Sequence, residues 1–456
     1  MKCVITGATG FIGQAAILEL VREGHQLTAL VRNPESASAK DLPCKAHLWI
    51  PGKTPINELS EMLKGVDAII HLAGEPIAAR RWSKPVKKRI LDSRVVGTRQ
   101  IVEALALLSP ETRPKTMLCA SAIGLYGDRG DEVLTELSAS GDGFLADVTA
   151  QWEAQTLEAE RLGVRVVLLR TGVVLGQGGG ALEKMQPVVL GSGHQWMSWI
   201  HLEDEVRFFS YALTNEIRGA FNLVSPEPVT NKDFTKAYAR AIGVPSMLFP
   251  ILKTPASILR VALGEMSQLL LASQKVMPER TLGCGFTFLY PTLDSALAEI
   301  YSVDNPNEEK FSASQFVARP LSEVFEFFSE AKNLEELTPP WLDFHILKVS
   351  TLQIQDQTEI DYRLRIHGLP LHWRSRIERW APGHEFMDTQ LKGPYSKWHH
   401  THRFEEVPGG TLVHDDVEYQ IPGGLLGKAA LGYFVRRDIN RIFSYRRNKV
   451  AEIFKR

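Results

Sequence analysis

The chain begins with a short apolar strand that runs directly into a glycine-rich turn. Residues 2–6 read Lys-Cys-Val-Ile-Thr, and residues 7–13 read Gly-Ala-Thr-Gly-Phe-Ile-Gly. A helical segment at 15–21 and a second strand at 27–31 follow. In such a strand–turn–helix, bare backbone N–H groups and the positive end of a helix face one point, where a pyrophosphate fits. We therefore expect this turn to bind a dinucleotide through Gly7, Thr9, Gly10, Phe11, Ile12 and Gly13.

The end of the second strand indicates which dinucleotide binds. NAD-selective sites carry an Asp or Glu near this point to hold the ribose 2′-hydroxyl, whereas an arginine accommodates a 2′-phosphate. Arg32 stands where the acidic residue would be. A surface arginine at a strand end is the alternative interpretation, but the missing carboxylate favours NADP(H) over NAD(H).

Composition limits the class of protein. With 456 residues the chain is too long for one ordinary core, so we expect two or more domains. The net charge of −1 argues against a general nucleic-acid binder, and no apolar stretch is long enough to span a membrane. The four cysteines have neither disulfide-type nor metal-type spacing, and the N-terminus enters a strand at once. These features predict a cytoplasmic protein.

Strand and helix patterns in the first half predict an α/β architecture. Apolar runs alternate with helical segments up to about residue 225, which is typical of a parallel sheet covered on both faces. The expected strands are 4–6, 27–31, 68–72, 116–120, 164–170 and 220–224, with long helices at 86–107 and 146–162. We expect a Rossmann-type, doubly wound parallel sheet over 1–230, followed by a helical lobe on the substrate side over 231–301.

A polar segment at 302–310 predicts a domain boundary. The expected second domain, 308–456, has strands at 311–317, 360–366, 371–380, 384–391, 399–406 and 411–420, a helical patch at 321–337 and one long helix at 426–454. This pattern predicts an α+β fold in which an antiparallel sheet curls around the helix. The basic residues of that helix are expected to face solvent; they are Arg436, Arg437, Arg441, Arg446, Arg447 and Lys449.

Four further segments carry a family resemblance. They read Ile-Ile-His-Leu-Ala-Gly at 69–74, Cys-Ala-Ser-Ala-Ile-Gly-Leu-Tyr-Gly at 119–127, Leu-Arg-Thr-Gly-Val-Val-Leu-Gly at 169–176 and Trp-Ile-His-Leu-Glu-Asp at 199–204. With the glycine turn they resemble the extended short-chain dehydrogenase/reductase superfamily, in its nucleoside-diphosphate-sugar epimerase-like branch. Segments 78–82 and 93–98 are similar to one uncharacterised subfamily, some members of which are described as cell-division-inhibitor-like. The resemblance implies that the cofactor also lies against Leu72, Ala73, Gly74 and Ser121.

The chain departs from this superfamily at its catalytic positions. Working members use a Tyr and, four residues later, a Lys that lowers the pKa of the Tyr. Here residues 144–145 and 148–149 read Phe-Leu and Val-Thr, and the usual catalytic Ser or Thr aligns with Ala122, or with Ser121 if the turn is shifted by one. The remaining catalytic candidates are Ser121, Tyr126 and Arg94, the last in place of a superfamily asparagine.

Candidates for substrate contact are Arg80, Arg81 and Trp199. The two arginines, with Arg94, would hold an anionic substrate; a solvated loop pair is the alternative. Trp199 is alternatively a residue that braces a loop.

The second domain is similar to the START/polyketide-cyclase (helix-grip) superfamily, which implies an apolar cavity between sheet and helix that holds a ligand. Its Trp-His-His-Thr-His run at 398–402 suggests a metal site, but only His400 and His402 share a strand face, so we expect no metal.

Two functions remain open. One is an NADP(H)-dependent, epimerase-like oxidoreductase acting on a small-molecule substrate, with the second domain binding an apolar ligand. The other is a catalytically lapsed NADP(H)-binding regulatory protein, related to cell division, that acts through a protein partner.

Overall fold

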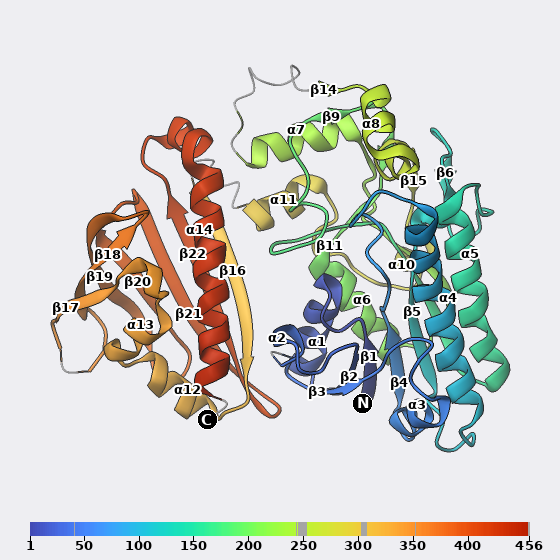
Figure 1. Cartoon of the computed structure of the whole chain (residues 1–456), viewed down its shortest axis with the longest axis horizontal. Coiled ribbons are helices and arrows are strands. Elements are labelled where there is room, and N and C mark those ends of the chain that lie inside the picture. Colours follow the sequence, from blue (N-terminus) through green and yellow to red (C-terminus); the bar gives the residue numbers. More distant parts are fainter. Residues whose placement is uncertain (41, 243, 245–252, 302–307, 352, 455–456) are drawn as a thin grey trace. The chain divides into compact units, whose positions relative to one another are not determined.

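The computed structural model describes residues 1–40, 42–242, 244, 253–301, 308–351 and 353–454 (Figure 1). Contacts between residues divide the chain into two compact units. The first is Met1–Tyr238 with Met247–Ala296, and the second is Ala239–Ser246 with Leu297–Arg456. Among the described residues, every helix is too short or too polar to cross a membrane.

The first unit is built on a parallel sheet whose strand order is β12-β7-β5-β4-β1-β2-β3. In chain order the strands are β1 Lys2–Thr6, β2 Gln26–Val31, β3 Lys45–Leu48, β4 Ala68–His71, β5 Thr116–Ala122, β7 Arg165–Thr171 and β12 Gly219–Leu223. Its main helices are α1 Phe11–Arg22, α2 Ala37–Lys40, α3 Ile56–Leu63, α4 Lys84–Ala106, α5 Phe144–Leu157 and α6 Leu202–Thr214. The central strands are almost wholly buried, as expected when helices cover both faces. The Rossmann-type prediction is confirmed.

Short strand pairs and further helices follow these elements along the chain or lie between them. The pairs are β6 Val133–Leu134 with β15 Lys275–Val276, β8 Val173–Leu175 with β11 Trp199–His201, β9 Val189–Leu190 with β14 Lys253–Thr254, and β10 Trp196–Met197 with β13 Val229–Thr230. The helices are α7 Asn231–Ala241, α8 Ala256–Leu263, α9 Gln268–Leu271, α10 Glu279–Gly283 and α11 Leu293–Tyr301.

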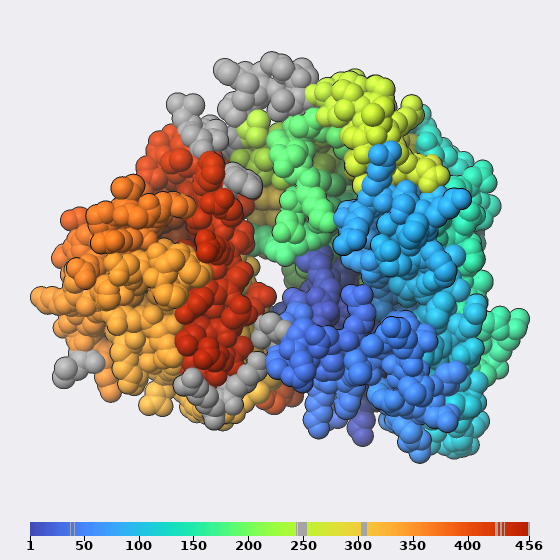
Figure 2. All heavy atoms as spheres, viewed as in Figure 1, coloured from blue at the N-terminus to red at the C-terminus, as the bar shows by residue number. Residues whose placement is uncertain are grey.

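The second unit is an antiparallel sheet of order β16-β22-β21-β20-β19-β18-β17, packed against one long helix. Its strands are β16 Glu308–Val317, β17 His345–Val349, β18 Glu359–Ile366, β19 Leu369–Ala381, β20 Glu385–Lys392, β21 Lys397–Val407 and β22 Gly410–Gln420, and its helices are α12 Leu321–Phe328, α13 Ala331–Leu337 and α14 Gly424–Ile453. Figure 1 shows α14 lying along the sheet. One side of α14 (red) stays at the surface beside α12 and α13 (orange) in Figure 2. This is the predicted helix-grip arrangement.

Several boundaries differ from the sequence-based prediction. Strands β3 and β17 were not predicted, because each is a sheet edge with mostly exposed or half-exposed residues and lacks an apolar run. The helix predicted at 146–162 is α-helical only to Leu157 and continues as a 3-10 turn. The patch at 321–337 is two helices, and the predicted linker ends earlier because β16 begins at Glu308; residues 302–307 lie outside the described residues.

Candidate functional site

The turn after β1 is too tight for side chains. Gly7 has a φ of +72°, and a Cβ there would lie 2.7 Å from the carbonyl oxygen of Leu72. The N–H of Gly10 donates to the carbonyl oxygen of Gly7 at 2.9 Å, and a Cβ on Gly13 would lie 2.2 Å from that same oxygen. Helix α1 then begins at Phe11 with no side-chain cap and no acidic residue in its first turn. The N-terminal amides of α1 therefore keep their capacity for an anion.

The other predicted residues of the turn have distinct positions. Thr9 is half-buried, and its carbonyl oxygen accepts a hydrogen bond from Nε2 of Gln14 at 3.1 Å. Ile12 is also half-buried. The ring of Phe11 lies against Gly179 and Gly180, where an added Cβ would come within 2.6 and 2.7 Å of it. Phe11 therefore packs the turn against the segment that follows β8.

The exit of β4 lies beside the glycine turn, because β1 and β4 are neighbours and Thr6 pairs with His71. The hydroxyl of Thr6 contacts Nδ1 of His71 at 2.7 Å and accepts from the N–H of Ala73 at 3.2 Å. Burial lowers the pKa of His71 to about 3, so this ring is neutral and structural. Leu72 and Ala73 are half-buried and Gly74 is exposed, which leaves the strand exit open beside the turn.

Arg32 follows β2 directly, and 77% of its side chain is exposed. Its Nη1 lies 3.9 Å from Oε2 of Glu75, and Nε of Arg89 lies 3.9 Å from Oε1 of the same carboxylate. Glu75 and Arg89 were not predicted from the sequence, where only the position of Glu75 directly after Gly74 hinted at a role. Two arginines thus flank one carboxylate at this point.

The three candidate arginines of the substrate side are held differently. Arg94 is partly buried: Nη1 donates to the carbonyl oxygens of Glu75 at 3.1 Å and Ile90 at 3.2 Å, and the guanidinium lies 5.1 Å from the Trp152 ring. Burial lowers the pKa of Arg94 to about 10. Arg80 and Arg81 are exposed. Arg94 therefore has a fixed place beside Gly74, while the loop arginines keep the solvated alternative open.

Ser121 and Tyr126 belong to a buried polar network. The hydroxyl of Ser121 donates to Oε1 of Glu153 at 2.5 Å, and Arg170 donates to both Glu153 oxygens at 2.9 Å. Arg170 also donates to the hydroxyl of Tyr126 at 3.0 Å, which in turn donates to Oδ1 of Asn222 at 2.7 Å. Tyr126 is fully buried, and burial raises its pKa despite the nearby Arg170.

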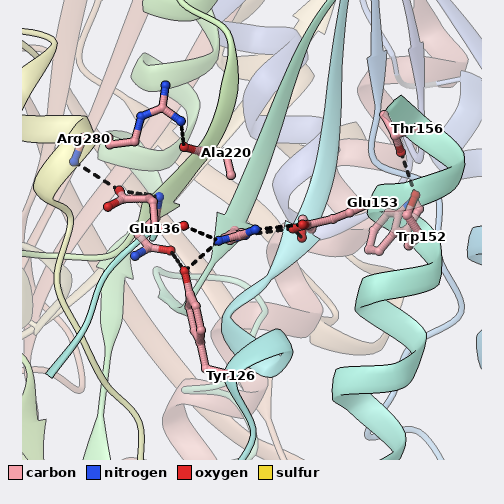
Figure 3. Close-up of polar contacts among 10 residues, drawn as sticks. Tyr126, Glu136, Trp152, Glu153, Thr156, Ala220 and Arg280 are labelled. Atoms are coloured by element: carbon pink, nitrogen blue, oxygen red, sulfur yellow. Dashed lines mark hydrogen bonds and ion pairs between the residues drawn. The ribbon is translucent and has the colours of Figure 1, made fainter. Parts of the chain in front are cut away.

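The network continues to Glu136, whose Oε1 accepts from the backbone N–H groups of Asn222 and Arg280. Figure 3 shows these contacts running from Glu153 past Tyr126 to Glu136 and Arg280. Both predicted catalytic hydroxyls are thus hydrogen-bonded in the interior: Ser121 links β5 to α5, and Tyr126 links the 3-10 turn after β5 to β7 and β12. The half-buried residue at the end of β5 is instead Ala122, which carries no hydroxyl.

The positions expected for the superfamily Tyr and Lys lie on the first turns of α5. Phe144 packs edge-on against Trp82 with ring centroids 5.1 Å apart, and the Thr149 hydroxyl donates to the backbone carbonyl of Leu145 at 2.8 Å.

Trp199, a candidate for substrate contact, is fully buried, and its Nε1 donates to the carbonyl oxygen of Glu227 at 2.9 Å. The indole therefore braces the interior and offers no open surface to a substrate.

The second unit contains a cavity of about 670 Å³ between the sheet and α14. Its walls are largely apolar and aromatic, and they include Leu364, Ile366, Leu371, Trp373, Trp398 and Phe443. A volume of this size lies within the range typical of small-molecule sites. Leu391 of β20 is 41% exposed and does not belong to these walls.

Polar residues lie at the inner end of the cavity. His400 and His402 share a strand face, and both lie 2.9 Å from Oδ1 of Asp415. Arg446 is only 11% exposed, and its Nη2 lies 3.5 Å from the same oxygen. The prediction that Arg446 faces solvent is therefore wrong, since this arginine turns inward to pair with a carboxylate on β22. His400, His402 and Asp415 bring three possible metal-ligand atoms within 4.8 Å of one another, and Arg446 contacts the same carboxylate.

Three family models match successive parts of the chain. Residues 3–223 match the NAD dependent epimerase/dehydratase family, residues 254–300 match a domain of unknown function (DUF1731), and residues 317–443 match the polyketide cyclase/dehydrase and lipid transport family. These matches agree with the two resemblances seen in the sequence.

Relatives with the same first unit are known from several organisms. An epimerase family protein of Mycobacterium leprae is 37% identical over 313 residues, which cover 67% of this chain and 96% of that protein. The chloroplastic SDR39U1 homolog of Arabidopsis thaliana is 37% identical over 66% of this chain and 86% of its own length. A crystal structure of human epimerase family protein SDR39U1 with NADPH superposes with a TM-score of 0.58 at 31% identity, covering 66% of this chain and 99% of that one. The chain therefore belongs to the NAD dependent epimerase/dehydratase family, among the epimerase family proteins these relatives represent, and adds a polyketide cyclase/lipid transport domain to their fold.

Proposed function

We propose that the first unit binds NADP(H). The observation that carries this proposal is the glycine turn: backbone atoms approach Gly7 and Gly13 so closely that only glycine fits, and no side chain caps the amides of α1. Leu72, Ala73 and Gly74 beside it offer backbone for the adenosine half. Arg32, exposed at the end of β2, supplies the charge for a 2′-phosphate. The NADPH present in the human relative's structure supports the same cofactor.

Titration of the full chain with NADPH and NADH tests this proposal directly. Nicotinamide fluorescence on binding gives both dissociation constants in the same buffer. We expect NADPH to bind more tightly, because only it presents a phosphate to Arg32. Equal affinities, or tighter binding of NADH, would contradict the assignment.

We also propose that the second unit binds an apolar ligand in its cavity. The cavity volume, its apolar walls and the match to the lipid transport family support this. The domains would then be residues 1–230 for the cofactor, 231–301 for the substrate-side lobe and 308–456 for the ligand. Saturable binding of the apolar fluorophore N-phenyl-naphthylamine by the full chain is the expected result, and absence of saturation would overturn the proposal.

An epimerase-like oxidoreductase is the activity that this arrangement would serve, with a small-molecule substrate brought beside the cofactor. Ser121, Tyr126 and Arg94 are the residues that would have to assist. A second candidate, a cytoplasmic NADP(H)-binding regulatory protein that acts through a partner, is favoured by one observation: the Ser121 and Tyr126 hydroxyls are consumed in a buried network.

An isotope experiment separates the two candidates. NADPH deuterated at the nicotinamide C4 would be incubated with the chain and a low-molecular-weight cell extract. Deuterium in another compound, formed only with active protein, would establish the oxidoreductase. NADPH that binds but keeps its label throughout would favour the regulatory protein.

A further inference from the structure

The cavity of the second unit has a polar inner end that an apolar ligand alone would not satisfy. Asp388, His400 and Arg446 line both the large cavity and a smaller one of about 50 Å³ next to it. Asp388 lies directly opposite His400 across β20 and β21, and His402 lies opposite Asp415 across β21 and β22. The polar residues therefore form one row across three neighbouring strands.

Asp415 is the fully paired member of this row. Oδ1 of Asp415 contacts His400 and His402 at 2.9 Å and Arg446 at 3.5 Å. Burial alone would raise the pKa of Asp415, but Arg446 and the hydrogen bonds from the two histidines hold it well below its usual value. The charges of Asp415 and Arg446 therefore offset each other. Nε2 of His400 is bonded to Asp415, so Nδ1 is the ring nitrogen that this contact does not use.

The rest of the row contains unpaired polar atoms. Oδ1 of Asp388, Nε of Arg446 and Nε1 of Trp373 are closed to solvent and have no hydrogen-bond partner among the described residues. All three residues line the large cavity. Burial raises the pKa of Asp388, which favours the neutral carboxyl that can donate as well as accept. Buried polar atoms of folded proteins are nearly always paired, so this group calls for a partner.

The opposite end of the cavity is apolar and open. Trp341, Leu369, Leu431 and Phe434 line it and are 44%, 70%, 51% and 50% exposed. Large apolar side chains that are exposed together around a cavity are typical of an entrance for an apolar molecule. The open end thus carries large apolar side chains, together with Arg441 over the Trp341 ring and the His367–Asp438 pair, whereas the inner end is polar.

We propose that this cavity takes an amphipathic ligand head-first, with a neutral hydroxyl or carbonyl group at Asp388, Arg446 and Trp373 and an apolar body that extends towards the rim. The inference rests on the proposed ligand-binding function of this cavity and adds the orientation and the head group. A neutral head fits because Asp415 and Arg446 already offset each other. A metal ion at His400, His402 and Asp415 would meet the Arg446 guanidinium.

The head group is tested with matched ligands and matched variants of the full chain. Dodecanol and dodecane are titrated by tryptophan fluorescence against wild type, Asp388→Leu and Asp416→Leu. The control carboxylate, Asp416, pairs with Arg403 on the other face of the sheet. We expect Asp388→Leu to weaken dodecanol about tenfold, the worth of one good hydrogen bond, and to leave dodecane unchanged or tighter. Asp416→Leu should change neither.

The orientation is tested with a dodecanol that carries bromine at its tail, which quenches nearby indoles. Head-first binding brings the bromine towards the rim, so Trp341→Phe should remove most of the quenching. If dodecane binds and Asp388→Leu loses no affinity for dodecanol, the head-group assignment is wrong, while the assignment of an apolar-ligand cavity stands. Quenching that survives Trp341→Phe would overturn the orientation. Failure of both ligands to bind would overturn the apolar-ligand proposal itself. Saturable Zn²⁺ binding that is lost in His400→Ala would replace this inference with a metal site.

Discussion

Replacing Glu153 with glutamine is expected to destabilise the first unit strongly, because this residue is the central acceptor of a buried network. Its carboxylate accepts two hydrogen bonds of 2.9 Å from Arg170 and one of 2.5 Å from Ser121. Both charged side chains are only 10% exposed. An amide has one acceptor oxygen, and its NH₂ group would face a donor. Glu153→Gln therefore leaves the Arg170 charge buried and unpaired, which costs about 3–5 kcal/mol.

The matched control is Glu158→Gln. Glu158 pairs with Arg161 at 2.6 Å, with side chains 41% and 77% exposed. The chemistry of the substitution is the same, but water compensates the lost pair, so we expect a loss below about 1 kcal/mol. The two variants differ essentially in burial.

Equilibrium unfolding in urea gives the total change, and native-state hydrogen exchange read by mass spectrometry assigns it to β7 and α5. If Glu153→Gln does not fold, Tyr126→Phe tests the same network more gently. It removes the hydroxyl between Arg170 and Asn222 and should cost about 1–3 kcal/mol. A loss for Glu153→Gln no larger than for Glu158→Gln would refute the structural role of the network.

Four further variants of the first unit and one control have expected outcomes. Arg32→Ala should weaken NADPH binding by about 1.5–3 kcal/mol and leave NADH binding unchanged, as fluorescence titration would measure. Arg161→Ala, at an equally exposed arginine, should change the affinity for neither cofactor. Gly13→Ala places a Cβ 2.2 Å from a backbone oxygen and should lower the free energy of unfolding by about 1–3 kcal/mol. In Gly10→Val the nearest atom to the Cβ is 3.2 Å away, so this variant should keep the circular dichroism of the wild type but no longer bind NADPH in a titration. Burial raises the pKa of Glu205 to about 8, so between about pH 4.5 and 8 the folded state binds a proton that the unfolded state has lost. The free energy of unfolding in urea should therefore fall as pH rises through this range, and Glu205→Gln should flatten the fall. A wild-type protein whose stability does not fall over this range would contradict the reasoning.

Hydrophobic periodicity and the positions of turn residues were enough to predict the two folds from the sequence. The buried strands β1, β2, β5 and β7 read as continuous apolar runs, and the glycines at 7, 10 and 13 mark the turn between β1 and α1. Edge strands β3 and β17 were not predicted, because a strand with one free edge and exposed faces needs no apolar run.

The candidate site could be predicted only in part. Strand order brings the exits of β1, β2 and β4 together, so Gly7, Arg32 and Leu72 could be assigned to one region from sequence alone. Side-chain direction could not, because Ser121 and Ala122 point to opposite faces of β5 and a shift of one residue exchanges them. Arg446 was misplaced for a similar reason, since pairing with Asp415, far away in sequence, turns it inward.

Native mass spectrometry of the intact chain, mixed with equal amounts of NADPH and NADH, tests the central claim most directly. It identifies each bound nucleotide by mass and reports how many molecules one chain holds. The account predicts one NADPH per chain, little NADH, and no NADPH on Gly10→Val. Equal occupancy by NADH and NADPH, or NADPH retained by a folded Gly10→Val variant, would contradict it.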